Sequence, residues 1–451
     1  MNNHIKTDTL TIKEINKMAI PLIFNSVIGM LIGLIDTAMI GRISLDAFGA
    51  VGLISTTINS ITGVLGAIAI AFNIAGAKNK GEGNTKGLID NFLSGILTSL
   101  IIGLSIWFIL LGFGNRLLQM IFGLEDVILQ ESISYMNLFG ITICLNMMLF
   151  MFSSLFKIIN TTKYLFIGNI TATITNVILN YILIFGKLGF EPMAVRGAGI
   201  ASVISLVLNI VIYISIIYIK KLLIVNDILS IDKMIKNGVI LLKNSLALMG
   251  QEILESTILV ICINAILSRI GVLELSIYTL LSSIVSIVLM PMYSYASTAL
   301  TLVSKNYGQK QYGRLLLIPK YSLKLAMIFC ISLSAILIIF KVNVVTLITN
   351  DYNLISYSLQ YFMIALCSCL FNIPNNIYKY SLQGIGDDKW VLLNSAVINV
   401  IGIGFIWFLS IALEMGIYGV YIGITFNYII LSFSNNYRFN HRIVLYSEKS
   451  I

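Results

Sequence analysis

Long apolar runs fill most of this chain, and each is long enough to cross a bilayer. A transmembrane helix needs about 20 apolar residues, whereas a membrane barrel would show alternating strands of about ten. With 58% hydrophobic and 11% charged residues, the chain has too little charge to cover a soluble surface. We predict an all-α polytopic membrane protein with twelve spans, at residues 18–40, 47–76, 88–114, 133–156, 164–186, 198–219, 238–267, 272–303, 320–340, 355–378, 390–412 and 416–434.

The basic residues fall mostly on one side of the predicted membrane. Of the 29 Lys and Arg, 23 lie on the side that holds the termini and 6 on the other. Because basic residues concentrate in cytoplasmic loops, we expect both termini in the cytoplasm and the protein in the plasma membrane. This orientation signal accounts for the net charge of +9. We therefore expect membrane lipid around a monomer, and no nucleic-acid partner.

A cytoplasmic stretch at residues 220–237 divides the spans into six and six. We take residues 1–219 as the amino-terminal lobe and 238–451 as the carboxy-terminal lobe with a short tail. Sequence motifs recur in the same order in both halves, for example GRISLD at 41–46 and SRIGVLE at 268–274. Six spans are an even number, so both halves enter the membrane in the same orientation. Parallel repeats of this kind are typical of secondary transporters.

The first apolar run carries one carboxylate, Asp36. Placing an ionised group in hydrocarbon costs roughly 2.5–3.5 kcal/mol, so its presence needs a reason. Asn25 shares a helix face with Asp36, while Asn176 and Asn180 lie one turn apart in the fifth span and Ser202 lies in the sixth. If these faces converge, an acid surrounded by neutral oxygens can take a proton or a small hard cation. The alternative is a static hydrogen-bond network, or an Asp36 at the water interface.

A second polar cluster lies in the seventh span, where Gln251, Glu252 and Glu255 occupy about one turn. Two carboxylates this close cannot both ionise cheaply, which suits a group that binds and releases protons. The alternative is a solvated pair in a wet vestibule. Prolines near span ends either form hinges or are tolerated by their neighbours. The candidates for a substrate cavity or hinge are Asn25, Pro21, Gln251, Pro291, Asn372 and Pro374.

Several motifs together resemble the multidrug and toxic compound extrusion (MATE) family. Pro21 followed fifteen residues later by Asp36 looks like helix 1 of that family. The stretches SLQGIGDDK at 381–389, KIINTTK at 157–163 and GAGIAS at 197–202 are similar to its turns and helix 6 start. The resemblance implies two pseudo-symmetric six-helix lobes. It also implies export of organic cations and other amphiphilic compounds in exchange for protons or sodium.

The resemblance also implies where a coupling ion would bind. One branch of the family pairs a glutamate of helix 7 with an aspartate of helix 10, and Glu252 or Glu255 stands at the first position. Asn372 stands at the second position, so that pair looks incomplete. In another branch the position of Asn180 is often acidic, and its replacement by an amide weakens a sodium site. The amino-lobe cation site of the family maps onto Asp36, Asn176, Asn180 and Ser202.

The sequence therefore predicts a secondary antiporter that works by alternating access. Protons are the expected driving ion, with sodium bound at Asp36 or Glu255 as the alternative; no cofactor and no resident metal are expected. A lipid-linked oligosaccharide flippase of the same superfamily is the nearest alternative, although its cavity tends to be lined with basic residues. An intramembrane enzyme would need a serine–histidine or histidine–metal group. A channel would need a filter motif, and an ATP-driven pump a phosphate loop.

Overall fold

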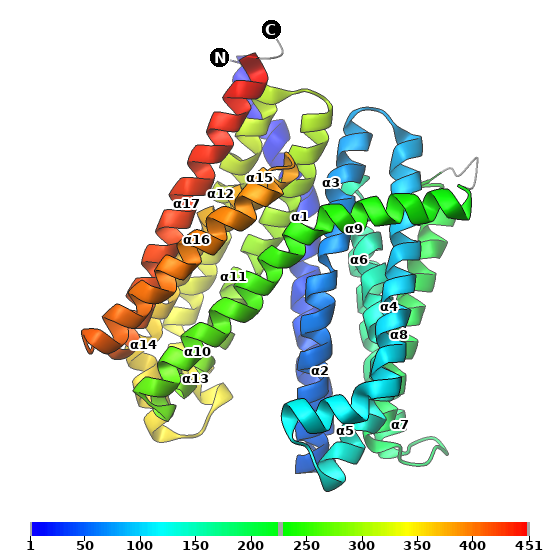
Figure 1. The fold of residues 1–451 in the computed structure, drawn as a ribbon, viewed down its shortest axis with the longest axis vertical. Coiled ribbons are helices and arrows are strands. Elements are labelled where there is room, and N and C mark those ends of the chain that lie inside the picture. The colour runs from blue at the N-terminus through cyan, green and yellow to red at the C-terminus, as the bar shows by residue number, and fades with distance from the viewer. Residues whose placement is uncertain (1, 224–228, 449–451) are drawn as a thin grey trace. The chain divides into compact units, whose positions relative to one another are not determined.

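A computed structural model describes residues 2–223 and 229–448, which form helices joined by short turns and contain no strand (Figure 1). Residues 224–228 of the predicted linker lie outside this description. The amino-terminal half has α1 (Asn2–Ile40), α2 (Leu45–Leu65), α3 (Ala67–Gly81), α4 (Thr85–Phe122), α5 (Asp126–Phe139), α6 (Thr142–Ile158), α7 (Lys163–Phe185) and α8 (Ala194–Ile219). The other half has α9 (Ile231–Ile253), α10 (Leu259–Ile270), α11 (Val272–Gly308), α12 (Tyr312–Ile339), α13 (Lys341–Ile348), α14 (Tyr352–Leu370), α15 (Asn372–Gly384), α16 (Asp388–Trp407) and α17 (Gly416–Glu448). Two π-helical segments, Leu254–Ile258 and Phe408–Ala412, continue α9 and α16.

The helices confirm the predicted all-α membrane fold. Within the described residues, eleven helical stretches are long and apolar enough to cross a membrane. They overlap the second to twelfth predicted spans almost completely, and the first predicted span lies within the 39-residue helix α1. Several helices are longer than the predicted spans. The 38-residue α4 is an example, and a helix of that length must tilt or extend beyond the bilayer.

Local sequence signals set many helix ends. Ser44, Asn84 and Asp351 are N-caps whose side chains accept a backbone N–H at the start of α2, α4 and α14. Such caps satisfy amide donors that the first turn leaves unpaired. Gly123 and Gly186 end α4 and α7 in the left-handed conformation, at φ 61° and 64°, where glycine has no Cβ to clash.

The chain divides into two compact units, and α1 and α9 each contribute to both. The amino-terminal unit is Ile20–Leu246, and the carboxy-terminal unit holds the described residues of Met1–Ala19 and Ala247–Ile451. Glu14 ties the start of α1 into the carboxy-terminal unit, because it accepts from Lys305 at 3.2 Å and from Arg314 at 3.0 Å. Tyr295 donates to Asn16 at 2.8 Å in the same unit. The lobe boundaries at 219 and 238 remain a prediction.

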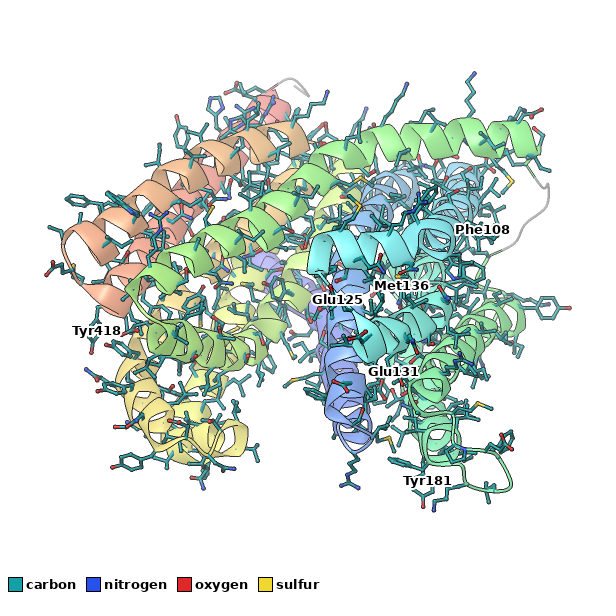
Figure 2. The ribbon with its side chains drawn as sticks, turned by 60° about the horizontal axis from the view of Figure 1, so that its bottom comes forward. Phe108, Glu125, Glu131, Met136, Tyr181 and Tyr418 are labelled. Carbon is teal, nitrogen blue, oxygen red and sulfur yellow. The ribbon has the colours of Figure 1, made fainter. Side chains whose placement is uncertain are left out.

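Close helix packing holds each unit together, while large apolar side chains remain on its outside. A Cβ at Gly103 of α4 would lie 2.4 Å from the Cys144 Cα of α6, so glycine allows these backbones to approach closely. Phe108 of α4 and Tyr181 of α7, both labelled in Figure 2, are 61% and 52% exposed. Exposed apolar surface on this scale is expected of a protein that faces lipid.

A half-buried carboxylate connects the turn after α15 to the last helix. Asp387 accepts from the Arg438 Nε at 2.8 Å and from the Arg442 Nε at 3.0 Å, both on α17. Burial opposes ionisation of Asp387, but hydrogen bonds and charge from the two arginines outweigh it and hold its pKa below the usual range. The interaction therefore stabilises the fold above the ordinary aspartate pKa of about 3.9. Its contribution is lost as the pH falls through the lower folded-state pKa.

Asp387→Asn is expected to lower the free energy of unfolding by about 1–3 kcal/mol at neutral pH, because two charged donors lose their acceptor. The measurement is thermal unfolding of the purified protein in detergent between pH 3 and pH 8. The difference from wild type should shrink below about pH 4. Asp388→Asn is the matched control, since Asp388 forms no salt bridge among the described residues. An equal loss in both variants would contradict a specific role for Asp387.

Candidate functional site

The structure brings the four residues of the predicted amino-lobe site into one hydrogen-bonded chain. Asn180 of α7 donates its Nδ2 to the Asp36 Oδ1 at 2.6 Å and lies 3.1 Å from the Asn176 Oδ1. Asn176 donates its Nδ2 to the Ser202 Oγ of α8 at 3.4 Å. Asn176 and Asn180 are 4% and 1% exposed, so the amides that lead from the acid to Ser202 are buried. A role for this chain in ion coupling remains a prediction.

A second network includes residues that the sequence analysis did not select. Asn169 of α7 donates to the Asn25 Oδ1 and accepts from the Asn209 Nδ2 at 2.6 Å and the Tyr213 hydroxyl at 3.0 Å. One signal for Asn169 was present in the sequence. It precedes Asn176 by about two turns, so helical periodicity extends the polar face of α7 toward it.

Both networks border the same cavity, which we call the amino-terminal pocket. Its volume is about 440 Å³, and Asn25, Asp36, Asn169 and Asn209 are among the residues that line it. A smaller cavity of about 320 Å³ also reaches Asp36. The amino-terminal pocket has apolar walls as well, from Ile32, Leu149, Phe150 and Leu206. A lone carboxylate beside apolar walls suits an amphiphilic ligand with a positive charge.

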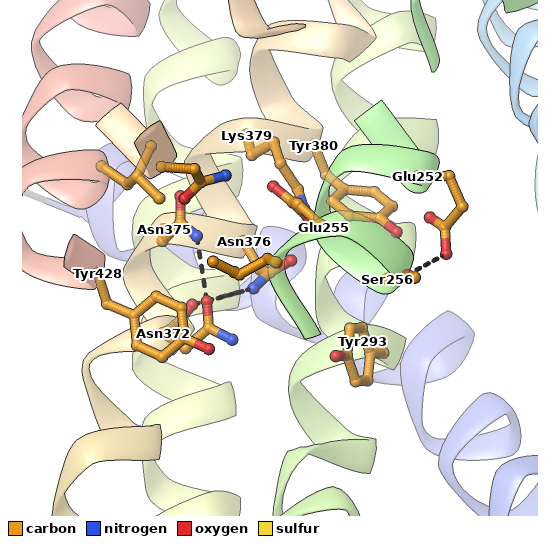
Figure 3. Close-up of a pocket in the computed structure, with 13 residues that line it drawn as sticks. Glu252, Glu255, Ser256, Tyr293, Asn372, Asn375, Asn376, Lys379, Tyr380 and Tyr428 are labelled. Atoms are coloured by element: carbon orange, nitrogen blue, oxygen red, sulfur yellow. Dashed lines mark hydrogen bonds and ion pairs between the residues drawn. The ribbon is translucent and has the colours of Figure 1, made fainter. Parts of the chain in front are cut away.

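The cluster on the seventh predicted span forms a different kind of site, which we call the carboxy-terminal pocket. Residues that line it are drawn in Figure 3. Its volume is about 340 Å³. Glu255 lies on the π-helical segment after α9, and its Oε2 is 2.6 Å from the Lys379 Nζ of α15. Gln251 donates to the other Glu255 oxygen. Insertions that produce π-helix turns are frequent at functional sites.

The two glutamates have different hydrogen-bond partners, and their predicted role in proton binding remains a prediction. Glu252 accepts from the Ser256 hydroxyl at 2.6 Å, whereas Glu255 is held by Gln251 and Lys379. Each carboxylate therefore has its own partner. The reason is the orientation of the π-helical turn, which directs Glu255 toward α15.

Lys379 is a further functional candidate that the sequence analysis missed, because the predicted span ended at 378 and left this lysine in a cytoplasmic loop. The structure places it inside α15, 5% exposed. Its spacing from Asn372 and Asn376 puts all three on one helix face. Asn372 itself accepts from Asn375 at 3.1 Å and Asn376 at 2.8 Å (Figure 3).

The three candidate hinge prolines lie within helices. Pro21 is inside α1 and Pro291 is inside α11. Pro374 is in the first turn of α15, directly after the break at Phe371, where a missing N–H breaks no hydrogen bond. Their role as hinges remains a prediction.

Two units of membrane helices, each with a polar pocket, are typical of a multi-pass membrane transporter. The MatE family model matches residues 21–182 and 247–408, and the chain belongs to this family. Members of the family are transporters that need no cofactor and generally use an ion gradient. The two matched segments begin 226 positions apart, which supports the internal repeat seen in the sequence.

Relatives agree with this assignment. The chain is 28% identical over 198 residues to "Probable multidrug resistance protein NorM" of Thermotoga maritima, covering 43% of this chain and 41% of that protein. It is 25% identical over 440 residues to the protein of the same name from Photorhabdus laumondii, covering 93% and 94%. The "Uncharacterized transporter YisQ" of Bacillus subtilis is 23% identical, with 89% and 88% covered.

Solved structures show the same fold. An "Outward-facing conformation of a multidrug resistance MATE family transporter of the MOP superfamily" superposes with a TM-score of 0.84 at 16% identity, covering 97% of both chains. A "MOP superfamily transporter from Pyrococcus furiosus" gives a TM-score of 0.82 at 17% identity, with the same coverage.

Proposed function

We propose that this protein exports organic cations or other amphiphilic compounds across the plasma membrane in exchange for protons. The observation that carries the proposal is the chain from Asp36 through Asn180 and Asn176 to Ser202. It places one ionisable group beside a cavity with apolar walls. The names of two relatives, both probable multidrug resistance proteins, support export of this class of compound.

The amides around Asp36 suit both of its protonation states. The Asn180 Nδ2 donates to the Asp36 Oδ1, which stabilises the carboxylate. The Asn180 Oδ1 has no hydrogen-bond partner among the described residues. Rotation of this amide would present its oxygen to a protonated Asp36, so one side chain can serve the loaded and the unloaded acid. Protonation would then remove the charge that holds a cationic substrate.

In this mechanism a substrate and a proton compete for Asp36 as the pocket opens alternately to the two sides. Binding of a proton from outside neutralises Asp36 and favours release of an organic cation there. On the cytoplasmic side, loss of the proton restores the negative charge that attracts the next cation. The proton and the substrate bind the same carboxylate in turn. Exchange requires this, because binding of one must favour release of the other.

We expect membrane vesicles containing the protein to accumulate ethidium when their lumen is made acid relative to the medium, and not to accumulate it without a pH gradient. The physical reason is that protons leaving the lumen drive the exchange for ethidium entering it. The measurement is ethidium fluorescence, with vesicles from cells lacking the protein as the control. No uptake under the pH gradient, with the protein present and folded, would contradict the proposed substrate class.

A further inference from the structure

The two pockets occupy equivalent places in the internal repeat. Lining residues of the carboxy-terminal pocket follow those of the amino-terminal pocket by 226 or 227 positions, close to the spacing of the two segments that match the family model. The pairs named next lie on α1 and α6 in one half of the chain and on α9 and α15 in the other. Examples are Asn25 with Glu252, Asn146 with Asn372, and Ser153 with Lys379.

The chemistry at equivalent positions is opposite. Leu149 and Phe150 give the amino-terminal pocket an apolar wall, and their counterparts in the carboxy-terminal pocket are Asn375 and Asn376. A wall of amides offers donors and acceptors to a polar ligand and little to an apolar one. The carboxy-terminal pocket is therefore not a second copy of the amphiphile site.

A buried ion pair decides which charges such a ligand carries. Lys379 is 5% exposed and pairs with Glu255, whose side chain is 25% exposed. A simple cation bound at Glu255 would displace Lys379 and leave its ammonium buried without a counter-charge, which is strongly unfavourable. A simple anion bound at Lys379 would likewise leave the Glu255 carboxylate without a counter-charge. A ligand that carries both charges supplies a counter-charge to Glu255 and to Lys379 at the same time.

A further donor in the pocket is unused. Asn399 of α16 lines the cavity and is 3% exposed. Its Oδ1 accepts from the Asn427 Nδ2 at 2.8 Å, but its own Nδ2 has no hydrogen-bond partner among the described residues. Because a buried polar group without a partner is unfavourable, this amide supports an acceptor group supplied by a ligand.

We propose that the carboxy-terminal pocket binds a small zwitterion of the α-amino acid class. The ligand carboxylate accepts from Lys379 and Asn399, while the ligand ammonium donates to Glu255 and faces the second carboxylate, Glu252. The cavity of about 340 Å³ is at the small end of the range for ligand pockets, which fits a compound of this size. The proposal does not depend on Asp36 or on the coupling ion.

The test is binding to the purified full-length protein in detergent, with no ion gradient. The probes are neutral α-amino acids, each compared with its methyl ester, which keeps only the ammonium, and its N-acetyl derivative, which keeps only the carboxylate. We expect at least one amino acid to bind tenfold or more tightly than both derivatives, by calorimetry and thermal shift. Failure of every amino acid to bind, or equal binding of its ester, would overturn the proposal.

Paired substitutions test whether the ion pair of Glu255 and Lys379 is responsible for the preference for zwitterions. The double variant Glu255→Gln/Lys379→Met removes both charges together and leaves neither residue as an unpaired ion, so we expect it to fold and to lose the tenfold preference. The charge-reversed variant Glu255→Lys/Lys379→Glu should recover it. Ser153→Ala, at the equivalent position of the amino-terminal pocket, is the matched control and should still bind the zwitterion.

Two results separate this proposal from the proposed export function. Asp36→Asn should retain zwitterion binding even if it no longer transports. A preference for zwitterions that persists in the folded neutral double variant would show that Glu255 and Lys379 do not form the site, whatever the outcome of the efflux experiments.

Discussion

Asp36→Asn should reduce gradient-driven efflux to background while leaving the protein folded. The substitution keeps the shape of the side chain. It removes the only group in the hydrogen-bonded chain from Asp36 to Ser202 that can bind and release a proton near neutral pH. Asn180 can still pair with an amide at position 36, so packing around the site should persist. The measurement is efflux of a fluorescent organic cation from proteoliposomes, with thermal unfolding as the check of stability.

The matched control for this prediction is Asp46→Asn. Asp46 lies exposed in the first turn of α2, so the same chemical change occurs away from the pocket. We expect it to retain most of the wild-type efflux. Near-normal gradient-driven efflux by Asp36→Asn would refute the assignment of Asp36 as the coupling residue.

A proton gradient alone should drive export in proteoliposomes, and a sodium gradient alone at fixed pH should not. A sodium ion loses its water on binding and gains most from several anionic oxygens. The chain around Asp36 offers one carboxylate, with Asn180 where a second could stand. In the carboxy-terminal pocket, Lys379 already occupies one oxygen of Glu255. Neither pocket therefore presents two free carboxylates from separate helices.

The variant Asn180→Asp tests the same argument in the opposite direction, by adding the missing carboxylate. It places a second carboxylate beside Asp36, so we expect efflux to become sodium-dependent. Efflux by the wild type under sodium alone, abolished in Glu255→Gln but not in Asp36→Asn, would show that the coupling site is in the other half of the chain and that the ion is sodium.

The sequence alone was enough to predict the helical membrane fold. Apolar length determines whether a helix spans the bilayer, and this property is local to each segment. Periodicity likewise placed Asn25 and Asp36 on one face of α1, and Asn176 and Asn180 on one face of α7. The internal repeat was visible in the order of its motifs. These features depend only on neighbouring residues or on comparison of one half with the other.

Packing between helices decided the rest. Lys379 and Glu255 are 124 positions apart in the chain, and Asn25 and Asn169 are 144 apart. Hydropathy assigned Lys379 to a loop, because an isolated lysine next to a span normally reaches water. Its burial is acceptable only because the π-helical turn brings Glu255 to it, which supplies the counter-charge. Such a pairing depends on which faces of distant helices meet, and the periodicity of a single helix carries no information about its neighbour.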